Sequence, residues 1–425
     1  MNVRQGWVEK FHDDELIVPL SQLSAVREAL QACQVEVSDR CVEENEVLAL
    51  ARLSGLTGIE AAARQLEHDP SVGQEVRAYR DVRNAAHPEA PSVSDLALLI
   101  KGLLLQLDRR YPGWEITIGK NYRPSLIRGY PHTEPGGEGK PTPVKAPFTG
   151  AIDPTLGQEG GRGVRVGLLD TRLFPHPSLT GRYIGGPADL QPADKTEFTE
   201  FDGHCTFVAS CILQQAPAAQ LYLRSVLNSN SEGTAWEAAV GIADLATHNL
   251  DVVNLSFGEY MTDDDSAPMV LAAAIRRFSR DTVVIAAAGN NGNVDNHRNE
   301  DVPPGVTPHT TSYPAALPEV AGVGAIDADG KEAKFTPKDA RWISLLARGV
   351  DLNAAYLTGE VRLPREARPV TFSGTANWAG CSFAAGVVTG IIAARTVPGR
   401  RSARDALAQL ERSLRQQPQP GLLIN

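Results

Sequence analysis

The chain has 425 residues, of which 41 are lysine or arginine and 51 are aspartate or glutamate, for a formal net charge of -10 at pH 7. This length exceeds what one small domain needs, so we expect one large unit and a smaller one. The acidic balance argues against nucleic acid as a partner, because sequence-independent binding to phosphates requires clustered basic side chains.

The first twenty residues carry charges where a secretory signal has an uninterrupted apolar core. No other run approaches the roughly 18 apolar residues of a membrane span. As written, the sequence predicts a cytoplasmic protein that does not contact a membrane.

Residues 1–120 are expected to form a small α+β domain, because β-prone runs alternate there with helical spacing of apolar residues. The expected strands are residues 14–19, 34–38 and 46–52, and the expected helices are 21–33, 73–86 and 93–110. In residues 121–163, Pro and Gly recur every few positions without periodicity, which indicates a linker.

Residues 164–425 are expected to form the larger domain, an α/β unit with a doubly wound, mostly parallel sheet. Apolar runs such as VRVGLLD, DVVNLSFG and DTVVIAAAGN alternate with helical segments. Such strands imply a parallel sheet covered on both faces, with a site at the carboxyl ends of the strands. Asp170, Ser256 and Asn290 lie at these ends.

The five cysteines follow neither a zinc-binding nor a disulfide pattern, because they are odd in number and lack paired spacing. They are Cys33, Cys41, Cys205, Cys211 and Cys381. The stretch CILQQAPAAQLYL also lacks the oxygen ligands that calcium requires. We therefore expect no metal and no cofactor.

Three polar residues offer the groups that acyl transfer from a serine needs: a carboxylate, an imidazole and a hydroxyl. Taken singly, Asp170 in GLLDTR could be a turn residue, His204 in DGHCTFVAS a surface or cap residue, and Ser382 in GCSFAAG a helix N-cap. Their order along the chain is Asp, His, Ser, which matches one known arrangement of such a triad.

Five motifs in this order resemble those of the subtilisin-like serine peptidase family. They are VGLLDTR, DGHCTFVAS, VVNLSFG, VVIAAAGNNG and GCSFAAG, and the resemblance covers about residues 164–395. It implies that Ser382 is the nucleophile, His204 the general base and Asp170 its orienting partner. It also implies that Asn290 and the backbone N–H of Ser382 bind the oxyanion.

The resemblance further implies that two backbone edges hold an extended protein or peptide substrate by strand addition. The residues implied for substrate binding are Ser231, Glu232, Gly233, Ser256, Phe257, Gly258, Ala287, Ala288 and Gly289. The last three would line the primary specificity pocket. Acidic residues in the segment after Asn290, together with Glu259, would favour arginine or lysine there if they line the pocket; the alternative is that they only solvate an exposed loop. That segment carries Asp295, Glu300 and Asp301.

The chain departs from the family pattern beside two of the triad residues. Cys205 stands where the family has a glycine, Phe207 where it has a second histidine, and Cys381 where it has a threonine. We expect a serine endopeptidase whose activity depends on the state of these thiols. The alternative is a pseudopeptidase that binds extended peptides without cutting them. An α/β-hydrolase is remote, since GCSFA lacks the final glycine of the nucleophile elbow.

Residues 1–120 stand where relatives carry an inhibitory propeptide. We therefore expect intramolecular regulation by this N-terminal domain.

Overall fold

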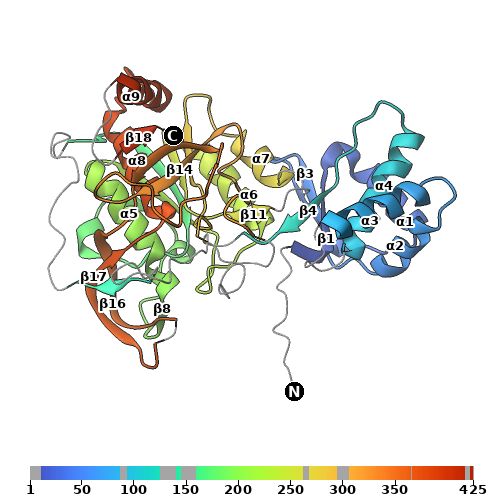
Figure 1. The fold of residues 1–425 in the computed structure, drawn as a ribbon, viewed down its shortest axis with the longest axis horizontal. Coiled ribbons are helices and arrows are strands. Elements are labelled where there is room, and N and C mark those ends of the chain that lie inside the picture. The colour runs from blue at the N-terminus through green and yellow to red at the C-terminus, as the bar shows by residue number, and fades with distance from the viewer. Residues whose placement is uncertain are drawn as a thin grey trace.

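The computed structural model describes residues 11–86, 93–124, 140–144, 159–261, 268–293, 306–364, 366–416 and 422–424. An N-terminal α+β unit lies at one end of the molecule and a larger α/β unit at the other, with β4 between them (Figure 1).

The N-terminal unit is an antiparallel sheet of four strands in the order β2-β3-β1-β4, covered by helices. Its strands are β1 (Phe11–Pro19), β2 (Val42–Asn45), β3 (Leu50–Leu53) and β4 (Gly119–Tyr122). Its helices are α1 (Leu23–Ala32), α2 (Ile59–Glu67), α3 (Gly73–Ala86) and α4 (Asp95–Arg110). The helical spacing correctly placed α1, α3 and α4 but missed α2, and residues 34–38 form only one isolated bridge.

Strand β1 packs on both of its sides, because its residues alternate between two cores. Leu16 and Val18 pack with the unit's own helices. Ile17, between them, packs with residues of the larger unit, as do Leu50 and Tyr122 from neighbouring strands. The period of two in a strand therefore divides one segment between an internal core and a docking surface.

The larger unit contains the mostly parallel sheet that the sequence predicts. Its eight strands have the order β18-β15-β14-β12-β10-β6-β9-β7. They are β6 (Arg165–Asp170), β7 (Tyr183–Ile184), β9 (Gln220–Ser225), β10 (Val252–Leu255), β12 (Val283–Ala287), β14 (Val320–Ile326), β15 (Ile343–Arg348) and β18 (Leu422–Ile424). Only β18 pairs antiparallel, at one edge.

Helices cover this sheet on both faces. Helices α5 (His204–Gln215) and α8 (Cys381–Arg395) pack in one core, and α6 (Ala235–Leu245) and α7 (Met269–Ile275) in the other. Strand β12 serves both cores, because Ile285 belongs to the first and Val284 to the second. Helix α9 (Ala403–Gln416) packs against α8.

Two smaller sheets complete the unit. Strand β11 (Glu259–Met261) pairs with β13 (Thr311–Tyr313). The other sheet has the order β5-β17-β16-β8, and its strands are β5 (Thr142–Pro143), β8 (Phe198–Thr199), β16 (Leu352–Arg362) and β17 (Val370–Trp378). β5 thus lies within the expected linker, and β4 ends at Tyr122, just past the expected boundary. The domain limits stay a prediction.

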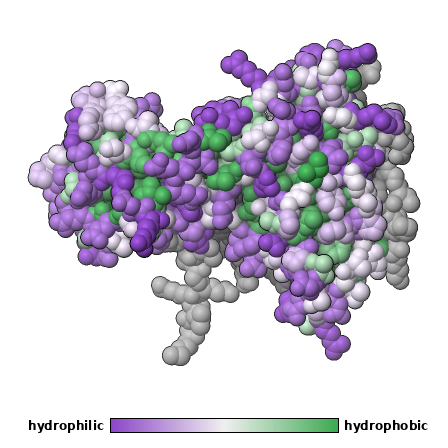
Figure 2. Space-filling view, turned by 180° about the vertical axis from the view of Figure 1, so that it is seen from behind, coloured by the Kyte–Doolittle hydropathy of each residue, from purple (hydrophilic) through white to green (hydrophobic). Residues whose placement is uncertain are grey.

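The surface mixes hydrophilic residues with scattered hydrophobic ones, seen from behind in Figure 2. The large hydrophobic side chains exposed among the described residues are Val47, Val82, Trp114, Ile184 and Val397. Within the described ranges, no helix combines the length and apolar character that crossing a membrane requires.

Candidate active site

The carboxylate and the imidazole that the sequence singled out lie in contact. Asp170 ends β6, and His204 begins α5. The Nδ1 atom of His204 lies 2.8 Å from Oδ1 and 2.9 Å from Oδ2 of Asp170. Asp170 is fully buried and His204 is 4 % exposed. Because a carboxylate accepts, Nδ1 carries the proton and Nε2 is the atom left to act as a base.

The segment that delivers His204 is held by neighbouring loops. Thr171 donates its N–H to Asp170 Oδ1 at 2.7 Å and its hydroxyl to the Phe201 carbonyl at 3.0 Å. Gly203 lies so close to Tyr356 that a Cβ atom there would come within 2.2 Å of the ring. A glycine is therefore needed directly before the histidine.

Ser382 lies in the first turn of α8 and is 4 % exposed. Its hydroxyl donates to the Ser256 backbone carbonyl at 3.2 Å, and Ser256 Oγ lies 3.1 Å from the Ser382 carbonyl oxygen. Within the part of the chain that the structure describes, Ser382 makes no hydrogen bond to His204. The ring of the adjacent Phe383 lies 5.3 Å from the imidazole, centroid to centroid. Hydrogen bonds between a catalytic nucleophile and its base, as expected for Ser382 and His204, often form only when substrate binds.

Asn290 is fixed beside this helix start. Its Oδ1 atom accepts from the Cys381 N–H at 3.0 Å, and its own N–H donates to the Tyr260 hydroxyl at 2.9 Å. Burial raises the pKa of Tyr260, so the phenol stays protonated. The Asn290 side chain is thus held against the start of α8 by its carbonyl oxygen.

The residues implied for substrate binding lie on three segments, residues 231–233, 256–258 and 287–289. Ser256 and Phe257 are fully buried, and so is Ser231, whose φ angle is 65°. The Ala288 carbonyl accepts from Trp342 Nε1 at 3.0 Å. The Gly233 N–H donates to the Pro124 carbonyl at 3.1 Å. A residue that follows β4 of the N-terminal unit therefore already occupies one implied substrate contact.

The two cysteines beside the triad are free and deeply buried. Burial raises the pKa of the Cys205 thiol well above its usual range and that of Cys381 to about 12. The thiolate is the reactive form, so both thiols are held in their unreactive state. This argues against the expected dependence of activity on the state of these thiols, and the structure contains no disulfide between them.

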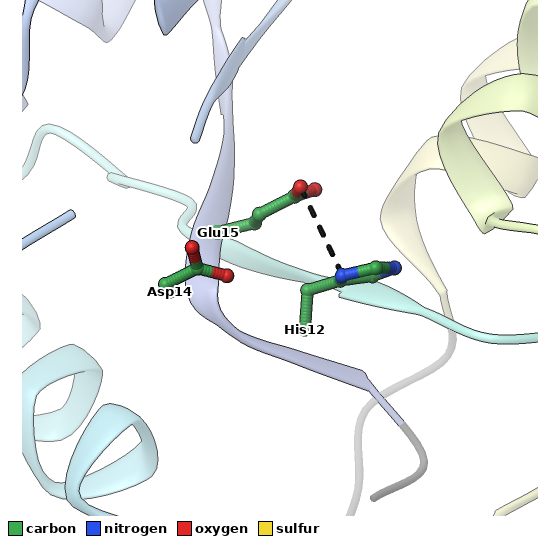
Figure 3. Close-up of side chains that lie close together, drawn as sticks. All are labelled: His12, Asp14 and Glu15. Atoms are coloured by element: carbon green, nitrogen blue, oxygen red, sulfur yellow. Dashed lines mark ion pairs between the residues drawn. The ribbon is translucent and has the colours of Figure 1, made fainter. Parts of the chain in front are cut away.

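One group of described residues has the proximity that a metal site requires. The ligand atoms of His12, Asp14 and Glu15 lie within 4.8 Å of one another (Figure 3). Glu15, however, accepts from Asn121 Nδ2 at 2.6 Å and lies 3.9 Å from an Arg52 nitrogen. Asn121 and Arg52 already provide a hydrogen bond and a positive charge to the Glu15 carboxylate. The cluster therefore acts as a polar contact between strands.

Four acidic residues were expected near the specificity pocket, and one further polar residue was not foreseen. Asp295, Glu300 and Asp301 lie outside the described residues, whereas Glu259 is buried in β11. Sequence reasoning missed Asn254, which accepts from the Ser256 hydroxyl at 2.7 Å. An amide inside the apolar run VVNLSF was the available signal.

Comparisons with known proteins point to one family. The model of the Subtilase family matches residues 161–398. The thermostable alkaline protease of Halalkalibacterium halodurans is 31% identical over 225 residues, which cover 51% of this chain and 53% of that protein. Subtilisin Savinase of Lederbergia lenta is 30% identical over 206 residues, or 46% of this chain and 67% of that protein.

A solved structure shows the same fold. Fervidolysin from Fervidobacterium pennivorans, a keratinolytic enzyme related to subtilisin, superposes with a TM-score of 0.54 at 18% identity. The match covers 92% of this chain and 55% of that one. The chain spans about half the length of several curated relatives that it matches. Since the family model matches more than half of its residues, the chain belongs to the subtilase family.

Proposed function

We propose that this protein is a serine endopeptidase that hydrolyses peptide bonds through an acyl-enzyme. The observation that carries the proposal is the buried contact of 2.8 Å between Asp170 and His204. Ser382, which the family resemblance identifies as the nucleophile, lies in the first turn of α8, the helix that packs against α5. The protease names of the curated relatives support the same reaction.

In the proposed reaction, Nε2 of His204 takes the proton of Ser382 Oγ as this oxygen attacks the substrate carbonyl carbon. Asp170 stays ionised and stabilises the imidazolium that forms. The Nδ2 of Asn290 and the Ser382 N–H donate to the oxyanion. His204 then protonates the leaving amine, and a water molecule releases the acyl group by the reverse sequence.

The Ser382 hydroxyl must rotate before it can react, because it donates to the Ser256 carbonyl. An extended peptide that pairs with residues 256–258 would compete for the backbone groups of this edge. Substrate binding would therefore favour the rotation toward His204.

A fluorophosphonate probe tests the proposal directly. It should label Ser382 covalently in the wild type, and Ser382→Ala should abolish the labelling. Ser178→Ala removes an exposed serine and should change nothing. Labelling that persists in Ser382→Ala would refute the assignment of the nucleophile.

The contact between Ser382 and Ser256 also favours a second candidate, a pseudopeptidase that binds extended peptides. In that case the wild type would bind a peptide without cutting it, and the probe would leave Ser382 unmodified. Cys205 and Cys381 beside the triad are the residues that would account for lost activity.

The proposal includes restraint of this site by the N-terminal unit. Asn121 in β4 accepts from the Trp236 N–H, in the first turn of α6, at 3.0 Å. Pro124 accepts from the Gly233 N–H, which an extended substrate would otherwise use. Ile17 and Tyr122 share a buried core with α6. The unit thus supplies both a docking surface and an occupant of the substrate edge.

A further inference from the structure

A buried carboxylate near the start of α5 is surrounded by hydrogen-bond donors from four residues. Asp202 Oδ1 accepts from Lys195 Nζ at 2.7 Å, from Ser229 Oγ at 2.7 Å and from Gln191 Nε2 at 3.0 Å. Its Oδ2 accepts from the Thr199 N–H at 2.8 Å. The Asp202 side chain is 1 % exposed. A carboxylate held by several donors in a low-dielectric site is fixed in position.

The carboxylate connects the two segments that carry Asp170 and His204. Asp202 precedes His204 by two residues in a tight turn. Gln191, one of its donors, gives its backbone N–H to the Leu173 carbonyl at 2.9 Å. Leu173 follows Asp170 by three residues. The same carboxylate therefore braces the chain on both sides of the pair.

The remaining donors extend the connection to the substrate edge. Lys195 Nζ donates to Ser229 Oγ at 2.9 Å, and Thr199 Oγ1 donates to the Ser229 carbonyl at 2.6 Å. The loop is closed by Asn228, whose N–H donates to the Glu232 carbonyl at 2.8 Å. Glu232 belongs to the implied substrate edge, so displacement of Ser229 would move that edge.

We propose that Asp202, Lys195 and Ser229 form a positioning hub that holds the substrate edge at residues 231–233 in register with His204. This inference deepens the proposed peptidase function and rests on it. Through the hub, hydrolysis depends on substrate residues several positions upstream of the cleaved bond. The edge that binds these substrate residues and the base His204 are both anchored at Asp202.

Two physical arguments favour positioning over stability as the role of the hub. A buried ion pair is seldom more stabilising than apolar residues of the same volume, because burial removes the hydration of both charges. Catalysis, in contrast, is sensitive to placement, since a shift of about 1 Å can cost about 100-fold in rate. The hub lies where such a shift would separate bound substrate from its base.

The first test compares two phosphonate inhibitors that share one reactive group and one residue at the cleaved position. One inhibitor ends there, and the other extends three residues upstream. The ratio of their inactivation rate constants at Ser382 measures the benefit of the edge. In Lys195→Met and in Ser229→Ala this ratio should fall about tenfold, a fraction of the about 100-fold cost of misplacement. Ser229→Thr, which keeps a hydroxyl, should restore it.

The chain offers a matched control in a second ion pair of similar burial. The side chains of Arg224 and Asp189 are 32 % and 2 % exposed, against 22 % and 1 % for Lys195 and Asp202. Arg224 donates to Asp189 and Asp244, which lie outside both the turn before His204 and the 228–233 loop. The Asp189 carbonyl accepts from the Leu173 N–H, but the Asp189 side chain keeps the N–H groups of Gly186 and Ser225 as donors when Arg224 is replaced. Arg224→Met should therefore leave the ratio unchanged. An equal fall in this control, or no fall in Lys195→Met, would overturn the proposal.

Amide hydrogen exchange of the full chain provides a readout that needs no catalysis. Lys195→Met should increase deuterium uptake in both segments 200–206 and 228–233, whereas Arg224→Met should affect neither. If neither the wild type nor Asn121→Ala, which removes the acceptor of the Trp236 N–H and so weakens docking of the N-terminal unit, reacts with either inhibitor, the peptidase function is refuted and exchange alone judges the hub. Uptake that rises in only one of the two segments would show that they are not coupled, and the hub would be rejected.

Discussion

The two halves of the candidate site are held by different kinds of contact. Asp170 and His204 already meet through their side chains at 2.8 Å. Ser382 instead donates to a backbone carbonyl at 3.2 Å and has yet to turn toward the imidazole. In the proposed mechanism the base is therefore preorganised, whereas the nucleophile must first rotate. The comparison teaches that this mechanism requires a movement of the Ser382 hydroxyl but none of the Asp170–His204 pair.

Breaking the preorganised half should have the largest effect. Asp170→Asn keeps the shape of the side chain but reverses the tautomer of His204, so kcat should fall about 10⁴-fold. Steady-state hydrolysis of a chromogenic peptide measures it, with KM expected to change little. A loss below tenfold would mean that the buried pair does not orient a base.

The nucleophile half can be probed at Asn290 by separating its two functions. Asn290→Asp keeps an oxygen for the Cys381 N–H but replaces the amide donor, so kcat should fall about 10²- to 10³-fold. Asn290→Ala removes both groups and serves as the comparison. Full kcat in Asn290→Asp would show that this amide does not contact the oxyanion.

Weakening the contact of the N-terminal unit with α6 tests whether that unit restrains hydrolysis. Asn121→Ala removes the acceptor of the Trp236 N–H, which weakens docking of that unit on α6. The initial rate of peptide hydrolysis should rise about tenfold, within the usual range of coupling between sites. Glu60→Gln, an exposed change on α2, is the control. An unchanged or lower rate in Asn121→Ala would argue against restraint.

The smallest effect at neutral pH is expected at Cys381. Burial raises its pKa from 9.0 to about 12, so its contribution to stability is complete below pH 9 and is lost as the pH rises toward 12. Relative to Cys381→Ala, the free energy of unfolding should fall by up to about 1.4 kcal/mol per pH unit in that window. Denaturant titrations at pH 8 and pH 10 measure the difference. If the free energies of unfolding of the wild type and of Cys381→Ala differ by the same amount at pH 8 and at pH 10, the pKa of the thiol is not raised.

Sequence reasoning predicted the parallel sheet because its strands are continuous apolar runs, and it identified the family through short motifs. It missed α2, a short helix that begins after Gly58, a residue with a left-handed φ of 87°. It also missed the hub and the contact of Pro124 with Gly233, because these join residues far apart in the chain. Local patterns carry no information on such pairs.

Strand β1 has a further consequence for how this protein can vary. Leu16 and Val18 face one core and Ile17 the other. Inserting or deleting one residue in such a strand would exchange its two faces. The hydrophobic positions of β1 should therefore tolerate replacement by similar residues. The length of β1 should change during evolution only by two residues at a time, which keeps each side chain on its own face.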